Sequence, residues 1–372
     1  MYAYSYLYCH YGGDIMMPLH GANIQGTYAA YDVALPKEEI IDFSTNTNCI
    51  ALTPALQKYW SELTQDIDCI CQYPGAEHGQ LIEAIAQMHQ LSQERLLLVN
   101  GTNEAIYLLA SLLSKKRVGI IEPTYPEYEC ALKAYNAHVV HIQYEDFCND
   151  ALDYSQVDAL ILCNPNNPTG QYLSYGDLEE KVKQMQAHGV LCIMDEAYMD
   201  FLPLKTDTIH AQTKQWAKKY RHVLFLRSLT KIFRIPGIRL GYVMAHPEYI
   251  KALEKRQPSW SVNRLAIALG IRLMVEQNYI QETKNYYHKE RERVTQQLAD
   301  QGWKVLFSTV NFFVVEVSRA DDLIVWCLRH GVVLRHTKNH KGLDGKYIRI
   351  GLQRPKENDR LLEVLKAYRH QE

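Results

Sequence analysis

A lysine lies among hydroxyl and guanidinium groups in the segment RSLTKIFRIPGIRLG. Lys231 follows Ser228 and Thr230 closely, and Arg239 comes eight residues after it. Two hydroxyls and a guanidinium together can bind a phosphate group. A lysine shielded from water near Arg239 is expected to have a lowered pKa, so that more of it is the neutral amine that condenses with an aldehyde. Taken alone, Lys231 is better explained as a surface lysine in a basic loop.

A carboxylate closes the apolar run VLCIMD at Asp195. A carboxylate desolvated by such a run needs a cationic partner. The protonated nitrogen of a pyridine ring would supply one, and the bond would keep that ring an electron acceptor. Tyr198, three residues later, could then reach a hydroxyl on the same ring.

Two further loops could hold an anion and a phenolate-like oxygen. Gly101 and Thr102 stand before an apolar helical pattern, and the amides at a helix N-terminus attract anions. The alternative is a plain turn in which Asn103 caps the helix. The segment NPNNPTG at 164–170 requires a rigid irregular loop that could fix the Asn167 amide, although Asn167 could also simply form a turn.

Together, these four segments supply an amine, a carboxylate, a partner for a ring oxygen and two halves of a phosphate site. Pyridoxal 5′-phosphate is a ligand that needs all of these groups at once. We therefore predict that it is the cofactor and that Lys231, Asp195 and Tyr198 are catalytic.

The four segments must be positioned by the strands that precede them. Short apolar runs alternate with amphipathic segments from about residue 95 to 245, which is typical of βα units around a largely parallel sheet. In such sheets ligands bind beyond the carboxyl ends of the strands. Seven strands are predicted, at 96–99, 118–121, 138–142, 158–163, 190–194, 223–227 and 240–244.

The chain of 372 residues is long enough for two cores. Helical patterns at 261–276 and 278–301, short apolar runs and a final helix at 355–369 predict a smaller α+β domain after the α/β domain. We place the large cofactor-binding domain at 51–258 and the small domain at 259–372. Residues 1–50 are expected to pack with the small domain and a dimer partner, beginning with a Tyr-rich extension at 1–16.

Composition excludes several classes of function. With 40 basic and 42 acidic residues, the net charge of −2 favours neither nucleic acid nor a membrane surface as partner. Nine scattered cysteines and the lack of a signal peptide or apolar span predict a cytoplasmic protein. His336 and His340 could ligate zinc on a helix, but nearby glycines predict a loop and no third ligand is evident, so no metal is predicted.

Five motifs resemble fold-type-I pyridoxal-phosphate enzymes, the class I/II aminotransferase group that includes histidinol-phosphate aminotransferases. They are YPGAEHGQL, NGTNEA, NPNNPTG, DEAY and SLTKIFRIPGIRLG, in family order from 73 to 241. The resemblance implies a seven-stranded sheet with helices on both faces and a homodimer to which Tyr73 contributes across the interface. It also implies that Tyr125 stacks on the cofactor ring and that Arg349 binds the substrate carboxylate. The other implied cofactor contacts are Gly101, Thr102, Asn103, Asn167, Asp195, Tyr198, Ser228, Thr230, Lys231 and Arg239.

Narrower motifs, among them HGANI at 20–24, QPSWSVNRLA at 257–266 and RHTKNHKGLDGKYIRIG from 335, resemble the cobalamin-pathway L-threonine-O-3-phosphate decarboxylases. That likeness implies that the substrate, and its phosphate above all, is contacted by His20, Gly21, Asn23, Asn167 and Arg335. Two stretches depart from the family pattern. Ala22 replaces a glycine, and Cys49, Ile50 and Ala51 stand where Pro-Leu-Gly is usual.

The sequence therefore predicts decarboxylation of L-threonine O-3-phosphate to (R)-1-amino-2-propanol phosphate, or of L-serine O-phosphate to ethanolamine phosphate. A methyl group is too small a difference to decide between them. The alternative is a histidinol-phosphate-type aminotransferase, which shares every cofactor residue. A noncatalytic cofactor sensor fused to a DNA-binding module is disfavoured, because no basic helix-turn-helix segment precedes the fold.

Overall fold

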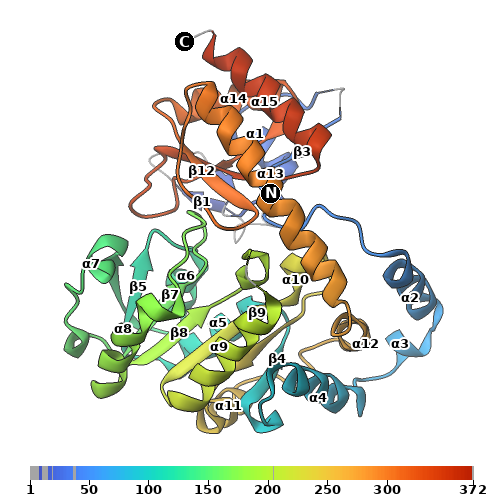
Figure 1. The fold of residues 1–372 in the computed structure, drawn as a ribbon, viewed down its shortest axis with the longest axis vertical. Coiled ribbons are helices and arrows are strands. Elements are labelled where there is room, and N and C mark those ends of the chain that lie inside the picture. Colours follow the sequence, from blue (N-terminus) through green and yellow to red (C-terminus); the bar gives the residue numbers. More distant parts are fainter. Residues whose placement is uncertain (1–7, 11–15, 19, 37–38, 204, 371–372) are drawn as a thin grey trace. The chain divides into compact units, whose positions relative to one another are not determined.

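The computed structural model describes every residue except 1–7, 11–15, 19, 37–38, 204 and 371–372 (Figure 1). The chain forms two compact units. We call Ile50–Asn167 with Gln171–Asn285 the large unit, and Met1–Cys49 with Pro168–Gly170 and Tyr286–Glu372 the small unit. Most of the predicted 1–16 extension lies outside the described residues, but Tyr8–His10 (β1) pairs with Met16–Pro18 (β2).

The large unit contains a seven-stranded sheet in the order β4-β10-β9-β8-β7-β5-β6. All neighbouring strands are parallel except β10, which runs antiparallel to both β4 and β9. The strands match the predicted runs: Leu96–Val99 (β4), Arg117–Glu122 (β5), His138–Gln143 (β6), Ala159–Cys163 (β7), Leu191–Asp195 (β8), Val223–Ser228 (β9) and Gly241–Met244 (β10).

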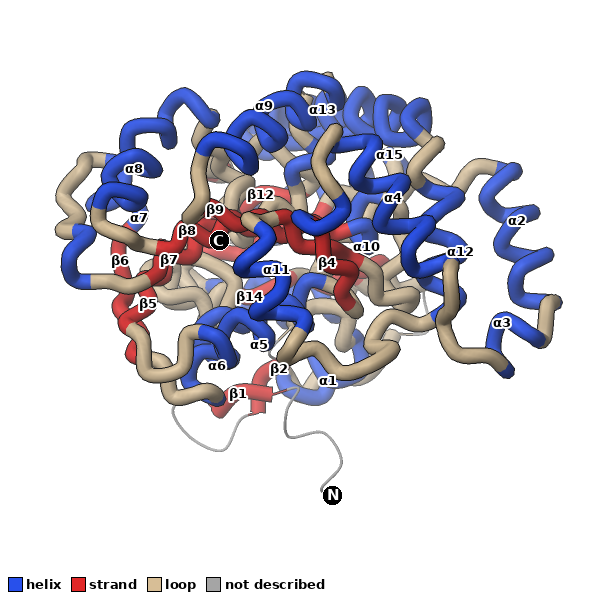
Figure 2. The backbone as a smooth tube through the Cα atoms, turned by 90° about the horizontal axis from the view of Figure 1, so that it is seen from below, coloured by secondary structure: helices blue, strands red, loops and turns tan. Residues whose placement is uncertain are grey.

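Helices cover both faces of this sheet, which confirms the predicted α/β fold. Figure 2 shows α4, α8 and α9 on one face and α5, α6 and α11 on the other. Because β7, β8 and β9 are covered on both sides, every one of their residues is buried. The helices are Pro54–Gln65 (α2), Asp68–Cys71 (α3), Glu77–His89 (α4), Thr102–Leu112 (α5), Glu127–Ala134 (α6), Tyr144–Cys148 (α7), Tyr175–Ala187 (α8), Thr206–Lys219 (α9), Leu229–Ile232 (α10), Pro247–Glu254 (α11) and Arg264–Leu273 (α12).

The small unit contains an antiparallel sheet in the order β11-β12-β15-β14 and a parallel pair of β3 with β13. Helix α13 begins in the large unit and ends in the small one. The elements are Ile24–Ala30 (α1), Ile41–Asp42 (β3), Gln277–Asp300 (α13), Lys304–Val305 (β11), Phe312–Glu316 (β12), Ala320–Arg329 (α14), Val332–Val333 (β13), Arg335–His336 (β14), Tyr347–Gly351 (β15) and Pro355–Arg369 (α15).

The division between the units falls inside α13 and not at the predicted residue 258. Helix α12 packs against α2, α3 and α4, so its apolar face belongs to the core of the large unit. The sequence of α13 does not indicate that the boundary between the units lies within this helix. Within the described ranges, no helix combines the length and the apolar character that crossing a membrane requires.

Candidate active site

The two predicted halves of a phosphate site lie together at one edge of the large sheet. Gly241, the first residue of β10, pairs with Val99 on one side and with Ser228 on the other. Because β10 is antiparallel, its start meets the carboxyl ends of β4 and β9. A Cβ atom on Gly101, whose φ is +73°, would meet the Arg239 guanidinium at 2.5 Å. Glycine is therefore required there, both for the left-handed backbone and for the approach of Arg239.

The start of α5 offers backbone amides to an anion. Its N-cap is Gly101, which has no side-chain oxygen to accept from them. The alternative in which Asn103 caps the helix is thus wrong, and Asn103 Oδ1 instead accepts a hydrogen bond from the Tyr125 hydroxyl at 3.3 Å. On the neighbouring loop, the hydroxyls of Ser228 and Thr230 are 2.7 Å apart. Amides, hydroxyls and the guanidinium thus form a consistent oxyanion-binding set.

Asp195 ends β8 and its side chain is buried, with 3% of the residue exposed. Its Oδ2 accepts from the Tyr128 hydroxyl at 2.7 Å, and its Oδ1 accepts from the Ala197 amide at 3.0 Å. Burial raises the pKa of Asp195, whereas these two hydrogen bonds and the positive charge of Lys231 pull the pKa down. A buried carboxylate held by two donors is well placed to pair with a further cation.

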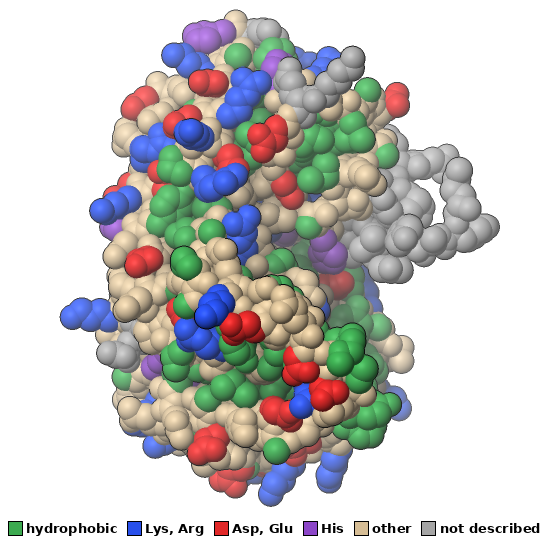
Figure 3. All heavy atoms as spheres, turned by 90° about the vertical axis from the view of Figure 1, so that its right-hand side faces the viewer, with side chains coloured by type: hydrophobic (Ala, Val, Ile, Leu, Met, Phe, Trp, Pro, Cys, Tyr) green, Lys and Arg blue, Asp and Glu red, His purple; other side chains and the backbone are tan. Residues whose placement is uncertain are grey.

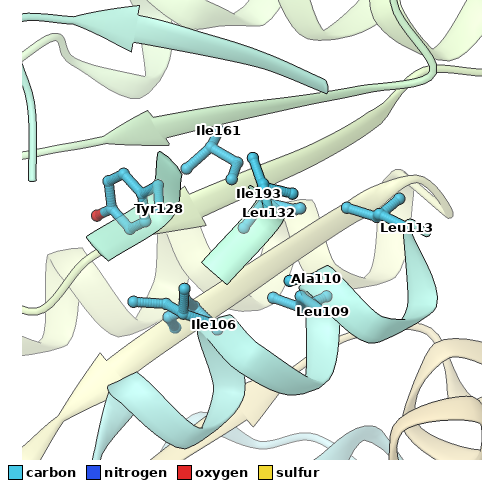
Figure 4. Close-up of a pocket in the computed structure, with 9 residues that line it drawn as sticks. Ile106, Leu109, Ala110, Leu113, Tyr128, Leu132, Ile161 and Ile193 are labelled. Atoms are coloured by element: carbon cyan, nitrogen blue, oxygen red, sulfur yellow. The ribbon is translucent and has the colours of Figure 1, made fainter. Parts of the chain in front are cut away.

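Tyr128 was not anticipated from the sequence. It lies on α6, three residues after Tyr125, and its ring meets the Tyr125 ring edge-on at a centroid distance of 5.6 Å. Figure 4 shows its ring at one end of a small apolar cavity lined by Ile106, Leu109 and Ile161, with the hydroxyl directed away from the cavity. From the sequence, a tyrosine on the apolar side of an amphipathic helix is expected to be a core residue. The contact of Tyr128 with Asp195 becomes visible only in the folded structure.

We expect Tyr128→Phe to lower the free energy of unfolding of the cofactor-free protein at neutral pH by about 1.5–3 kcal/mol, because a buried carboxylate loses a donor. Chemical denaturation would measure the loss. The matched control, Tyr125→Phe, removes the longer 3.3 Å bond to Asn103, whose partner is a neutral amide, and should cost less. Equal costs would contradict a special role for the Tyr128 hydroxyl.

The 164–170 segment forms the rigid loop that the sequence predicts. Asn164 exchanges two hydrogen bonds with Leu173, each 2.8 Å long. Asn166 donates to the Pro123 carbonyl at 2.8 Å and accepts from the Thr124 hydroxyl at 3.3 Å. Two asparagines thus fasten the loop, and Asn167, 7% exposed, follows them directly. The loop is consistent with a fixed Asn167 amide.

Lys231 lies on the single turn α10, which directly follows β9, and its positive charge lowers the pKa of Asp195. Tyr198 is buried at 5% exposure just after β8. Tyr73, by contrast, is 74% exposed on the large unit and stacks on Trp260 at a centroid distance of 4.5 Å. The predicted contact of Tyr73 with a neighbouring subunit stays a prediction.

A second, strongly basic cluster lies in the small unit. Arg335 and Arg349 are directly opposed on β14 and β15, and both are buried. Arg335 donates to His336 Nε2 at 2.8 Å and to Asn339 Oδ1 at 2.9 Å, while Arg349 donates to the Ser44 carbonyl at 2.6 Å. Like charges opposed on a sheet destabilise the fold. The cluster is therefore suited to binding anions.

The histidines of this cluster do not form a zinc-binding helix. His336 ends β14, and His340 lies in the following turn at 2% exposure. Burial, followed by the charges of Arg335 and Arg349, lowers the pKa of His340 well below its ordinary value. The charges of His336 and His20 act in the same direction on that pKa. Neutral His340 adds no positive charge beside the two arginines.

The other N-terminal residues have mainly structural contacts. Asn23 is the N-cap of α1, and its Oδ1 accepts from the Gly26 amide at 3.0 Å. A Cβ on Gly21 would meet the Ser44 carbonyl oxygen at 2.2 Å, so only glycine fits. The structure thus explains Asn23 and Gly21 by local packing, and a substrate contact for either stays a prediction.

A family model described as aminotransferase class I and II matches residues 38–365. The chain belongs to the class I and II aminotransferase family. It is 31% identical to a threonine-phosphate decarboxylase of Salmonella typhimurium, over 93% of this chain and 95% of that protein. The structure of a histidinol-phosphate aminotransferase from Clostridium acetobutylicum superposes with a TM-score of 0.80 at 26% identity, covering 89% of this chain and 99% of that one.

The cofactor of this family member is pyridoxal 5′-phosphate. A solved histidinol-phosphate aminotransferase from Sinorhizobium meliloti in complex with this cofactor has the same fold, with a TM-score of 0.79 at 20% identity over 94% of this chain and 95% of that one. The residues present fit the cofactor. Asp195 offers a buried anion for the ring nitrogen, and glycine at 101 lets the Arg239 guanidinium approach the start of α5, where a phosphate would bind.

Proposed function

We propose that the chain is a decarboxylase of a phosphorylated hydroxy-amino acid, L-threonine O-3-phosphate or L-serine O-phosphate, acting in the cytoplasm in cobamide nucleotide-loop synthesis. The observation that carries the proposal is the opposed pair Arg335 and Arg349. A substrate with both a carboxylate and a phosphate has one anion for each arginine. The similarity to a threonine-phosphate decarboxylase over nearly the whole chain supports the same substrate class.

The residues of the chain decide which bond at the substrate α-carbon breaks. The bound cofactor supplies a ring that accepts the electrons of that bond. Arg349 would bind the carboxylate bidentately, and Arg335 would bind the phosphate, so the two arginines fix the orientation of the substrate. An orientation that favours breaking the bond to the carboxylate would release carbon dioxide. Lys231 would then deliver a proton to the α-carbon.

Mass-balanced product analysis tests this proposal. Purified protein is incubated separately with L-threonine O-3-phosphate and L-serine O-phosphate, and both carbon dioxide and phosphorylated amine are measured. Equal amounts of the two products support decarboxylation. A keto acid without carbon dioxide would make the chain an aminotransferase, the reaction of the Clostridium neighbour with 26% identity. The substrate with the higher kcat/KM is the better candidate for the natural one.

Arg335→Lys is expected to raise KM for the phosphorylated substrate by about tenfold while kcat changes less. Lysine keeps the charge but loses the planar fork that binds two phosphate oxygens. Steady-state kinetics with the phosphorylated and the unphosphorylated amino acid would measure the effect. The unphosphorylated substrate should respond much less. A similar rise in KM for both would argue against Arg335 as the phosphate ligand.

We also propose a homodimer that involves the surface around Tyr73. Four apolar residues of the large unit are 60% exposed or more, and we call them the apolar patch: Ile67, Ile70, Tyr73 and Trp260. Figure 3 shows hydrophobic side chains gathered among charged ones on one face of the protein. Exposed apolar groups of this kind are typical of interfaces.

Ile70→Asp is expected to weaken the dimer by at least roughly tenfold in dissociation constant, because a charge would be buried without a partner. Sedimentation velocity over a range of concentrations would detect the monomer. Val275→Asp is a matched control, because Val275 is 70% exposed and lies outside the patch. Ile70→Asp protein that sediments like the unsubstituted protein would refute the proposed interface.

A further inference from the structure

Two pairs of consecutive residues connect the candidate cofactor site to the opposite face of the large sheet. Asp195 is followed by Glu196 at the end of β8, and Ser228 is preceded by Arg227 at the end of β9. Successive side chains of a strand point to opposite faces. Asp195 contacts Tyr128 of α6, whereas Glu196 contacts Tyr175 of α8, and these helices cover opposite faces (Figure 2).

Arg227 and Glu196 form a buried ion pair on the face covered by α8 and α9. Their Nε and Oε2 atoms are 2.9 Å apart, and the residues are 2% and 1% exposed. The Tyr175 hydroxyl donates to Glu196 Oε1 at 2.5 Å, and Arg227 donates to the Thr213 hydroxyl at 3.2 Å. Asp200 Oδ1 lies 3.6 Å from Arg227 Nη1. Two helices and the residues after β8 therefore hold the pair.

The ion pair connects β8 and β9 at the level along the strands where Asp195 and Ser228 lie. Asp195 stands beside Leu226 in the parallel register, and the Glu196 amide donates to the Leu226 carbonyl at 2.9 Å. The next residues along, Glu196 and Arg227, are consequently neighbours across the strands. Their contact comes one residue after Asp195 and one residue before Ser228.

We propose that Arg227 and Glu196 are a positioning pair that sets the spacing between Asp195 and the loop Ser228–Lys231. This inference rests on the proposed assignment of these residues to the ring nitrogen, phosphate and aldehyde of the cofactor. The affinity of a ligand that contacts both Asp195 and Ser228 depends on that spacing. The affinity of a ligand that binds only at the phosphate end does not.

A purely stabilising role explains the pair less well. Removing two charges from water costs several kcal/mol per ion in general, and well-packed apolar residues often stabilise a core equally. Arg227 contacts Glu196, Thr213 and Asp200 at once, so it ties the end of β9 to the residues after β8 and to α9. A fixed distance between the strand ends matters where a ligand must touch several groups within a fraction of an ångström.

The test compares a ligand that contacts both Asp195 and the phosphate site with a ligand that contacts the phosphate site alone. Full-length protein stripped of cofactor is titrated with pyridoxal 5′-phosphate, and inorganic phosphate is measured as a competitor. We expect Arg227→Met and Glu196→Gln to raise Kd for pyridoxal 5′-phosphate by about tenfold or more, with Kd for phosphate changed by less than about twofold. Arg227→Lys, which keeps charge but not the fork, should recover only part of the affinity.

Lys181→Met is the matched control. Lys181 is another buried cation of the large unit, 6% exposed, and its contacts with Asp150 and the Cys148 carbonyl lie away from the strand ends. It should lower the melting temperature without changing either Kd. If Arg227→Met does not fold, Glu196→Gln, which keeps the shape of the side chain, decides the question.

The inference is overturned if both dissociation constants rise together in these variants, or if neither changes. Failure of the proposed function gives a different result. In that case the unsubstituted protein itself would acquire no pyridoxyl group on Lys231 after borohydride reduction. A labelled Lys231 together with unchanged affinities in the variants would refute the positioning role alone.

Discussion

Lys231→Ala is expected to lower kcat by more than about 1,000-fold, because in the proposed function the same amine holds the cofactor and moves the proton at the α-carbon. The structure places Lys231 on the turn after β9, near enough to Asp195 for its charge to lower the pKa of that carboxyl. Borohydride reduction followed by peptide mass spectrometry should find a pyridoxyl group on residue 231 of the unsubstituted protein. The variant should carry none.

Lys214→Ala is a suitable control, because Lys214 is a partly exposed lysine of α9 whose side chain contacts Gln90. It should leave both the labelling and kcat unchanged. A pyridoxyl group found on another lysine of the unsubstituted protein would show that Lys231 has been assigned wrongly. Substantial activity in the Lys231→Ala protein without added amine would lead to the same conclusion.

Asp195→Asn should lower kcat by about 100- to 1,000-fold while making the cofactor-free protein more stable at neutral pH. The loss of activity follows from the proposed role of Asp195, whose negative charge would keep the ring nitrogen protonated. The gain in stability follows because asparagine removes a buried charge, while its Oδ1 can still accept from the Ala197 amide and its Nδ2 can donate to the Tyr128 hydroxyl oxygen. Steady-state kinetics and thermal unfolding of cofactor-free protein would measure the two effects.

The pH dependence of that gain has a definite sign. Burial raises the pKa of Asp195 in the folded protein above its ordinary value of 3.8. Between the two pKa values the folded state binds more protons than the unfolded state, so stability falls as pH rises through this window. The stability difference between Asp195→Asn and the unsubstituted protein should therefore be large at neutral pH and shrink toward about pH 4. A constant difference would mean that the charge of Asp195 carries no penalty.

The fold of the large unit could be predicted because its strands are buried on both faces. Such strands appear in the sequence as continuous apolar runs, and all seven were located to within about two residues. The direction of β10 could not be predicted in this way, because an apolar run of four residues looks the same in either direction. The unit boundary was also hidden, since it lies within the continuous helix α13.

The loops of the candidate site were predicted from residue type. The residues that contact and hold these loops were not predicted. Lys231, Asp195 and Arg239 stand out because their chemistry is unusual after an apolar strand. Tyr128 and Arg227 act through contacts with residues far away in sequence, 67 residues away for Tyr128 and Asp195. No local pattern encodes such contacts, and they become visible only when α6, β8 and β9 are placed side by side.

The structure also accounts for the two departures from the family pattern. Ala22 has a φ of +64°, a left-handed conformation that favours glycine, so alanine is strained there. The amide of Cys49 donates to the Tyr287 hydroxyl at 2.7 Å, a hydrogen bond that proline could not make. The first departure costs stability and the second adds an interaction within the small unit.

The position of β10 constrains when the protein can acquire its cofactor during synthesis. β4 is an edge strand whose neighbour in the sheet is β10, so Leu96–Val99 leaves the ribosome well before its partner Gly241–Met244 exists. Until then this apolar strand lacks its partner in the sheet, and Arg239 is translated only two residues before Gly241. A nascent chain that ends before residue 244 should thus bind chaperones more readily than the cofactor.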